Sequence, residues 1–196
     1  MSAGSSRPGP KAQKGLPEAG TRIVTDKRGV TAIEFAIIAP VFFMILFSTF
    51  EAGLLFTRLA MLDNAVSILS KSIYIGALAD GIDDGTISQD DVEKMVCEEV
   101  YVVMPSCDED ITVELTEVTS LDSLPTSDVE CIDSMDLEFN PAVTFDPGGS
   151  GSNVFMRVCI TVDLLTPGLG LGLALTKTST DRFELISSTA FRNEPY

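Results

Sequence analysis

The stretch Val30–Thr57, VTAIEFAIIAPVFFMILFSTFEAGLLFT, decides the fold of this chain. It has 28 residues, of which only Glu34 and Glu51 are charged. As a helix it would be about 42 Å long, more than the ~30 Å hydrocarbon core of a bilayer. Its uncharged part, Phe35–Phe50, has 16 residues and is slightly short, so we expect the span to include one or both glutamates near its ends. Pro40 should weaken or kink the helix, which membrane helices tolerate.

Two other interpretations of this run fit less well. A buried helix of a soluble domain is disfavoured because the run is long, rich in phenylalanine and preceded by a basic segment. A conventional secretory signal is disfavoured because the run is too long for one and no small-x-small cleavage site follows it. The sequence therefore predicts a membrane-spanning helix.

The charge distribution predicts the orientation of this helix. The chain carries a net charge of -16, yet residues 1–29 contain six basic and two acidic side chains. This leaves seven basic and 27 acidic side chains in residues 30–196. A basic segment before a span stays in the cytoplasm, so the acidic part is expected to cross the membrane, although the tail could also lack topological meaning. The acidic surplus argues against nucleic acid as a partner.

The helical pattern continues beyond the membrane. Apolar residues recur at helical spacing to about Ile75, and Gly76 is expected to end the helix. A second helix is predicted over Gln89–Val103, with Ser88 as its N-cap and Asp91 three residues later, as in a capping box.

The pattern then changes to the period of two that strands show. Ile111–Thr116 and Met135–Phe139 fit this period, Arg182–Arg192 alternates loosely, and Val154–Val162 is a more continuous apolar run. We assign all four segments to strands. We predict an α+β fold, in which the long helix extends into a small domain with a second helix and an antiparallel sheet of about four strands. The segment Leu164–Leu175, LLTPGLGLGLAL, is too short and too rich in glycine for a second span, and is expected to form an apolar loop packed on the domain or on a partner.

Four cysteines, Cys97, Cys107, Cys131 and Cys159, all follow the membrane segment. An even number in an exported domain indicates disulfides, and of the three possible connectivities we favour 97–107 with 131–159. A zinc site is the alternative, but no CxxC pair is present, and we expect no metal and no cofactor. The chain has no histidine and no recognisable catalytic motif, so we predict that it is not an enzyme.

A processing motif precedes the membrane helix. The basic pair at positions 27 and 28, then Gly29, then an apolar helix, resembles the type IV prepilin signal, and GVTAIEF resembles its Flp/Tad branch. On this resemblance Gly29 ends the leader, Val30 begins the mature chain and Glu34 is its fifth residue. Phe35 stands where the major Flp pilins usually have tyrosine. The length of the chain, the following AIIAP and the ending FRNEP are instead similar to TadE/TadG-like pseudopilins.

The resemblance implies a function and partners. Residues 1–29 would be a cytoplasmic leader removed by a prepilin peptidase, residues 30–78 the pilin-like membrane helix, and residues 79–196 an acidic periplasmic domain. The protein would be a minor pilin or pseudopilin, anchored in the lipid of the bacterial inner membrane. It would assemble with other Tad pilins and the assembly platform, and support adherence and biofilm formation. If it enters the pilus, it would reach the cell surface.

Individual residues follow from the same resemblance. Glu34 would pair with the N-terminal amine of a neighbouring subunit, which would offset the cost of a charge in the membrane. A carboxylate that only reaches the interface is the alternative, and it is the favoured interpretation of Glu51, which lies near Arg58. The alternative function is an uncleaved single-pass protein whose periplasmic domain binds a partner.

Overall fold

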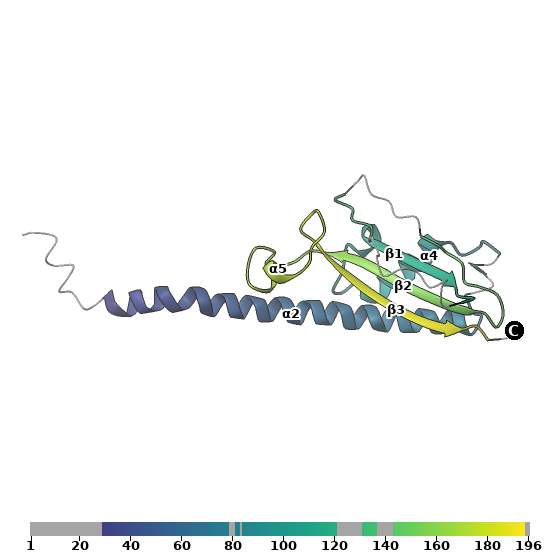
Figure 1. Cartoon of the computed structure of the whole chain (residues 1–196), viewed down its shortest axis with the longest axis horizontal. Coiled ribbons are helices and arrows are strands. Elements are labelled where there is room, and N and C mark those ends of the chain that lie inside the picture. The colour runs from purple at the N-terminus through teal and green to yellow at the C-terminus, as the bar shows by residue number, and fades with distance from the viewer. Residues whose placement is uncertain (1–28, 79–80, 83, 121–130, 137–142, 195–196) are drawn as a thin grey trace, which may run out of the picture. The chain divides into compact units, whose positions relative to one another are not determined.

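The computed structural model describes residues 29–78, 81–82, 84–120, 131–136 and 143–194 (Figure 1). By packing, the chain divides into two units, Met1–Phe42 and Phe43–Tyr196. The predicted α+β class is confirmed: a long N-terminal apolar helix, a second helix and an antiparallel sheet are all present.

Helix α2, Val30–Tyr74, is the long helix that the sequence predicts. It continues through Pro40, although proline has no N–H to donate to the carbonyl of Ala36. The helix ends within one residue of the expected position. Gly76 follows in the left-handed region with φ 78°, and its N–H donates to the carbonyl of Ile73.

Within the described residues the sheet has three strands in the order β1-β2-β3, with both pairs antiparallel. They are β1, Ile111–Glu117, β2, Asn153–Val162, and β3, Phe183–Arg192, which correspond to three of the four predicted segments. The strand expected at Met135–Phe139 is wrong at its start, where Met135 lies in a turn. The Asp133 carboxylate accepts the N–H of Met135, which fixes that turn, whereas residues 137–139 lie outside the described residues.

Helix α4, Gln89–Val100, begins at the predicted capping box. The Ser88 hydroxyl accepts the N–H of Asp91, and the Asp91 carboxylate accepts the N–H of Ser88. The helix ends at Val100, three residues before the expected end. There the N–H of Val103 bonds the carbonyl of Val100 in a tight turn, and the following Pro105 disfavours helical backbone at the residue before it.

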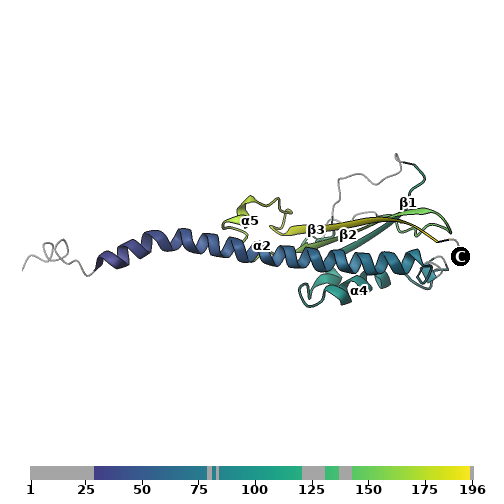
Figure 2. The same ribbon diagram turned by 90° about the horizontal axis from the view of Figure 1, so that it is seen from below.

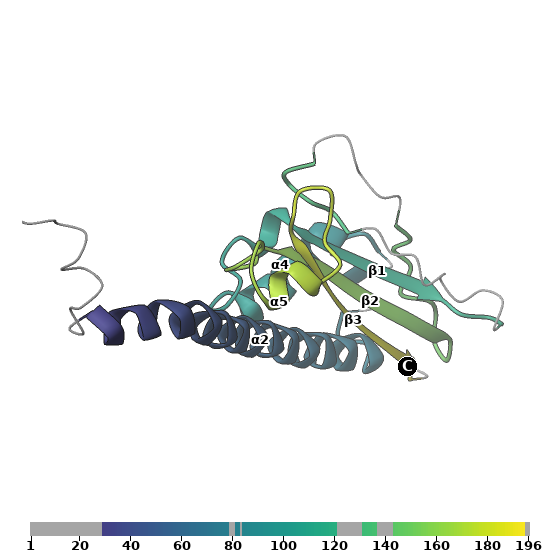
Figure 3. The same cartoon turned by 60° about the vertical axis from the view of Figure 1, so that its left-hand side comes forward.

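Helices α2 and α4 cover the same face of the sheet (Figures 2 and 3). Alternate strand residues point into this layer, as in the paired Val113 and Val158 of β1 and β2. Polar contacts also join the helices to the sheet. The buried Ser187 hydroxyl of β3 donates to the Asp63 carboxylate of α2 over 2.6 Å, and the Val113 N–H of β1 donates to the Glu93 carboxylate of α4 over 3.1 Å. The core is formed by buried apolar side chains from all these elements, among them Leu62, Val66, Ile73, Val92, Val96, Val100, Val113, Leu115, Met156, Val158 and Ile160.

The opposite face of the sheet is covered in part by the segment 131–133. Thr112 and Cys159 are register partners on β1 and β2, and both side chains are buried. The Thr112 hydroxyl accepts the N–H of Ile132, and the Thr161 hydroxyl donates to the carbonyl of Ile132. These bonds hold the segment across two strands, which explains why polar threonines occupy buried strand positions.

Candidate processing and assembly site

The predicted cleavage point lies at the first residues of α2. Gly29 and Val30 are both exposed, and the α-helix begins at Val30. A Cβ added to Gly29 would meet no atom within 4 Å. The fold itself therefore does not require glycine at position 29, and any such requirement must come from outside the described chain.

Glu34 and Phe35 follow on the first turns of α2, and both are exposed. Within the described residues, no hydrogen-bond or ion-pair partner is found for the Glu34 carboxylate. The structure therefore keeps the four predicted processing and assembly residues on one short stretch of helix, where they are accessible to another molecule.

The surface of α2 that follows is apolar and uncovered. The helix contains a window of mean hydropathy 2.4, none of which is buried, and its length and composition are sufficient to cross a membrane. The core helix of a soluble protein would bury such a window, so its exposure favours lipid or a partner as its surroundings. The exposed large side chains of this stretch are Val30, Ile33, Phe35, Ile37, Ile38, Val41, Phe42, Phe43, Met44, Ile45, Leu46, Phe47 and Phe50.

Glu51 is the functional candidate that sequence reasoning missed. Its side chain is 0% exposed, and its carboxylate accepts the N–H of Leu165 over 3.1 Å and that of Thr166 over 2.8 Å. The Thr166 hydroxyl donates to the same carboxylate over 3.0 Å. The expected interfacial carboxylate is thus a buried acceptor that fixes the loop after β2. The sequence signal for this role is that Glu51 directly follows an uncharged run, Phe35–Phe50, which is too short by itself to span the bilayer.

A second contact joins the same loop to α2 one turn earlier. The Ser48 hydroxyl accepts the N–H of Leu171 over 3.1 Å and donates to the Met44 carbonyl over 2.7 Å. Gly170 lies against Ser48 with φ 52°, and a Cβ there would overlap the hydroxyl. The predicted apolar loop is therefore packed on α2, and it carries the short helix α5, Leu171–Ala174 (Figures 1 and 2).

Comparison with known proteins addresses most of α2, from its first residue to residue 68. The family model described as TadE-like protein matches residues 29–68. Residues 29–68 are TadE-like. The predicted resemblance is confirmed for this segment, whose first residue is Gly29, and it implies an association with Tad pili. Neither a curated protein nor a solved structure matches the chain.

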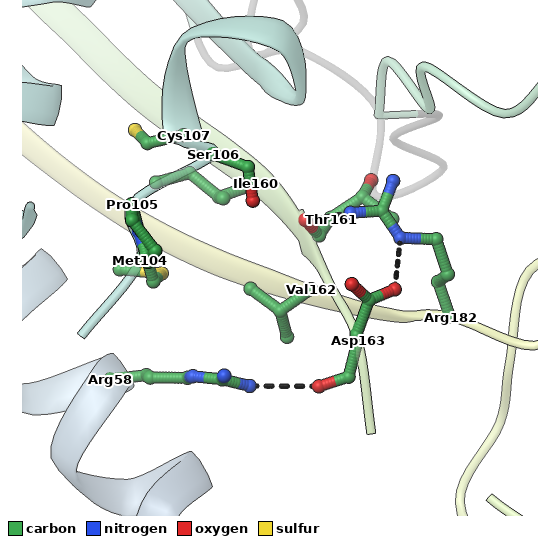
Figure 4. Close-up of a pocket in the computed structure, with 10 residues that line it drawn as sticks. All are labelled: Arg58, Met104, Pro105, Ser106, Cys107, Ile160, Thr161, Val162, Asp163 and Arg182. Atoms are coloured by element: carbon green, nitrogen blue, oxygen red, sulfur yellow. Dashed lines mark hydrogen bonds and ion pairs between the residues drawn. The ribbon is translucent and has the colours of Figure 1, made fainter. Parts of the chain in front are cut away.

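The TadE-like segment also contains Arg58, which ties the helix to the domain (Figure 4). Its guanidinium donates to the carbonyl of Val103 over 3.2 Å and to the carbonyl of Asp163 over 2.9 Å. The Asp163 carboxylate in turn accepts from Arg182 over 2.9 Å. The cavity between these groups is about 40 Å³, room for water rather than for a substrate.

Arg182 is the centre of a buried ion cluster. It donates to both oxygens of Asp110 over 2.6 Å and to Asp133 over 2.9 Å, and all three side chains are almost fully buried. Burial alone would raise the pKa of Asp110 and Asp133, but their hydrogen bonds, including those from Arg182, outweigh it, so both pKa values lie below the ordinary value. The hydrogen bonds to Asp110 raise the pKa of Arg182 above its ordinary value. This cluster holds segment 131–136 and β3 together.

The four cysteines of the domain lie in the two pairs that we favoured. Cys97 of α4 lies opposite Cys107 with a Cα–Cα distance of 5.5 Å, and Cys131 lies opposite Cys159 of β2 at 5.6 Å. Both distances are those of disulfides. The first pair fastens the end of α4 to the 3-10 turn η2, Cys107–Glu109, and the second fastens segment 131–133 to the sheet.

Proposed function

We propose that this chain is a minor pilin or pseudopilin of the Tad (Flp) pilus system, processed by a prepilin peptidase between Gly29 and Val30. One observation carries the proposal: the TadE-like match begins at Gly29, and the exposed apolar helix begins at Val30. A peptidase acting at the cytoplasmic face needs its bond directly before the membrane helix. The side-chain-free Gly29, which the fold does not require, suits entry of the backbone into a protease cleft.

The role proposed for Glu34 follows from its exposure. Cleavage frees an α-amine on Val30, and Glu34 is four residues further along the helix. An ionisable side chain within a membrane segment is costly and is retained for a function. Because the described chain offers it no partner, we assign it the amine of a neighbouring subunit. Phe35 beside it, 65% exposed, would pack on that neighbour.

The proposed topology puts the basic residues 1–29 in the cytoplasm and the domain in the periplasm. The charge asymmetry supports this orientation, and the two cysteine pairs suit an oxidising compartment. In this setting the partners are membrane lipid, other Tad pilins and the inner-membrane assembly platform. The proposed role is structural, in pilus assembly and hence in adherence and biofilm formation, rather than catalytic.

N-terminal sequencing of the protein extracted from membranes tests the proposal. The mature chain should begin at Val30 in cells with the peptidase and upstream of Gly29 in cells without it. Gly29→Leu should block cleavage, whereas Gly53→Leu should not. Gly53 lies within α2, away from the proposed bond, and a Cβ there likewise meets no atom within 4 Å. An unprocessed chain in peptidase-containing cells would instead support the uncleaved single-pass protein with a partner-binding domain.

A further inference from the structure

The uncharged run of α2 is too short for the bilayer by itself. Phe35–Phe50 would span about 24 Å as a helix, against a hydrocarbon core of ~30 Å. Some of the next turn, which begins with Glu51, must then lie at membrane depth or at its boundary. Beyond Glu51 the next charged residue is Arg58, so an apolar surface that included Glu51 would reach from Phe35 to Thr57, about 35 Å.

The contacts of Glu51 make this extension possible. Its carboxylate is fully buried and accepts three hydrogen bonds from Leu165 and Thr166. Irregular backbone does not face lipid within the hydrocarbon core, and near the core it needs protein or water to satisfy its polar groups, so this loop belongs at the outer boundary of the core. The loop therefore supplies hydrogen-bond donors to the buried Glu51 carboxylate, and the carboxylate supplies the acceptor for two backbone N–H groups of the loop. Ser48 does the same for a third, that of Leu171.

The outward surface of this loop is apolar. Leu165, Leu169 and Leu173 are exposed, with Leu173 at 66%, and no charged residue lies between Leu164 and Thr176. Phe56 on the adjacent turn of α2 is 71% exposed. Between loop and helix lies a groove of about 290 Å³ that is lined by apolar side chains alone: Ala52, Leu55, Phe56, Leu59, Leu171, Leu175, Phe183 and Leu185.

Charged groups flank this apolar zone on the domain side. Arg58 and Arg182 both donate hydrogen bonds to Asp163, which is the residue directly before the loop in the sequence. At the other end of the loop, Lys177 donates to the carbonyl of Pro167 and pairs with Asp181, as a basic side chain at a membrane boundary does.

We infer that the loop Leu164–Leu175 is a second membrane-contacting element, seated against α2 at the outer boundary of the hydrocarbon core, with Glu51 as the residue that holds it there. The apolar groove between them takes lipid acyl chain. The inference rests on the proposed membrane span of α2 and adds to it. The occupant is lipid, because the loop surface is continuous with the helix surface that the span places in lipid.

The chain has no tryptophan, which allows a direct test. Single-tryptophan variants of the full chain are reconstituted without other proteins in phosphatidylcholine–phosphatidylglycerol vesicles that contain acyl-brominated lipid. Leu173→Trp reports on the loop, and Ile45→Trp reports on the span. Ile75→Trp is the control, because Ile75 is also exposed and apolar but lies about 36 Å further along the chain direction of α2 than Glu51. The brominated lipid should quench the tryptophan fluorescence of Leu173→Trp and Ile45→Trp, and should leave that of Ile75→Trp unchanged.

The outcomes separate this inference from the proposed function. Quenching of Ile45→Trp without quenching of Leu173→Trp keeps the span and overturns the loop inference. Absence of quenching at both positions overturns the span itself. In membranes of cells that assemble pili, the fluorescence of Leu173→Trp could resist quenching by both bromolipid and aqueous acrylamide. That result would show that a protein partner covers the loop, and it would overturn the inference that the loop contacts lipid. Glu51→Leu combined with Leu173→Trp should lose the quenching at the loop, whereas Glu51→Leu with Ile45→Trp should keep it.

Discussion

Arg182 and Asp110 form a bidentate pair in the domain interior, with both guanidinium–carboxylate distances at 2.6 Å. Asp133 and Asp163 also accept from Arg182, so one cation serves three carboxylates. Removing the cation would leave Asp110 and Asp133 buried without their counter-charge. Removing one partner of a buried pair costs far more than the pair itself contributes.

Arg182→Met should therefore destabilise the domain by about 3–5 kcal/mol. Arg192→Met is the matched control, since Arg192 is exposed on β3 and donates only to the carbonyl of Gly151 among the contacts described. Its effect should stay within about 0.5 kcal/mol. Chemical denaturation of the full chain in detergent, followed by circular dichroism, measures both. Equal midpoints for the two variants would contradict a structural role for the cluster.

Stability should fall as the solution is acidified. The pKa values of Asp110 and Asp133 are lower in the folded chain than the ordinary aspartate value of about 3.9. The unfolded chain therefore takes up protons first, so this contribution is complete above about pH 4 and is lost as the pH falls through the folded pKa values. Thermal unfolding between neutral and acidic pH should show a falling midpoint, and Asp110→Asn should show a shallower fall. A midpoint that rises on acidification would refute this assignment.

Glu51→Leu should release the loop from α2. It leaves the N–H groups of Leu165 and Thr166 without their acceptor, at about 1–3 kcal/mol for each buried group. Hydrogen exchange read by mass spectrometry should accelerate in residues 164–175 and remain unchanged in β1. Thr49→Val is the control, because Thr49 is exposed and its hydroxyl donates to the carbonyl of Ile45 in its own helix. Unchanged protection of the loop in Glu51→Leu would show that Glu51 does not hold it.

Glu34→Ala should leave processing at Gly29 largely intact but impair assembly, because the proposed pairing with a neighbour's amine is lost. The ratio of mature protein in sheared pili to that in membranes measures this. Phe35→Tyr serves as the control, since tyrosine is the usual residue of the resembled pilins and should be tolerated. Wild-type assembly by Glu34→Ala would remove the proposed charge pairing.

Mass mapping without reduction should find the 97–107 and 131–159 disulfides in protein from the periplasmic side. In the loop-closure model each stabilises the domain by about 2–4 kcal/mol. The second closes the longer loop, 28 residues against 10, so its loss should cost about 1 kcal/mol more. Cys131→Ser with Cys159→Ser and the equivalent double variant of the first pair provide the comparison. Four free thiols in periplasm-derived protein would contradict an exported, oxidised domain.

Much of the fold could be predicted because its signals are local. The long uncharged run determines α2, the Ser88–Asp91 spacing determines the start of α4, and the alternating residues determine three strands. The segment at Met135 alternates in the same way, but the Asp133 carboxylate bonds the backbone there and makes a turn. Local periodicity cannot reveal which side chain competes for the backbone.

The proposed processing segment likewise follows from the sequence, because its motif is contiguous from position 27 to Phe35 and its apolar character needs no folding partner. Tertiary structure alone decided the roles of Glu51 and Arg182. Glu51 meets Thr166 across 115 positions, and Arg182 meets Asp110 across 72. A buried charge is stable only when distant groups satisfy it, so its partners are known only once the chain has folded. The sequence thus determined the helix and carries the proposed signal before it, and the fold decided that a glutamate within that helix holds a loop against it.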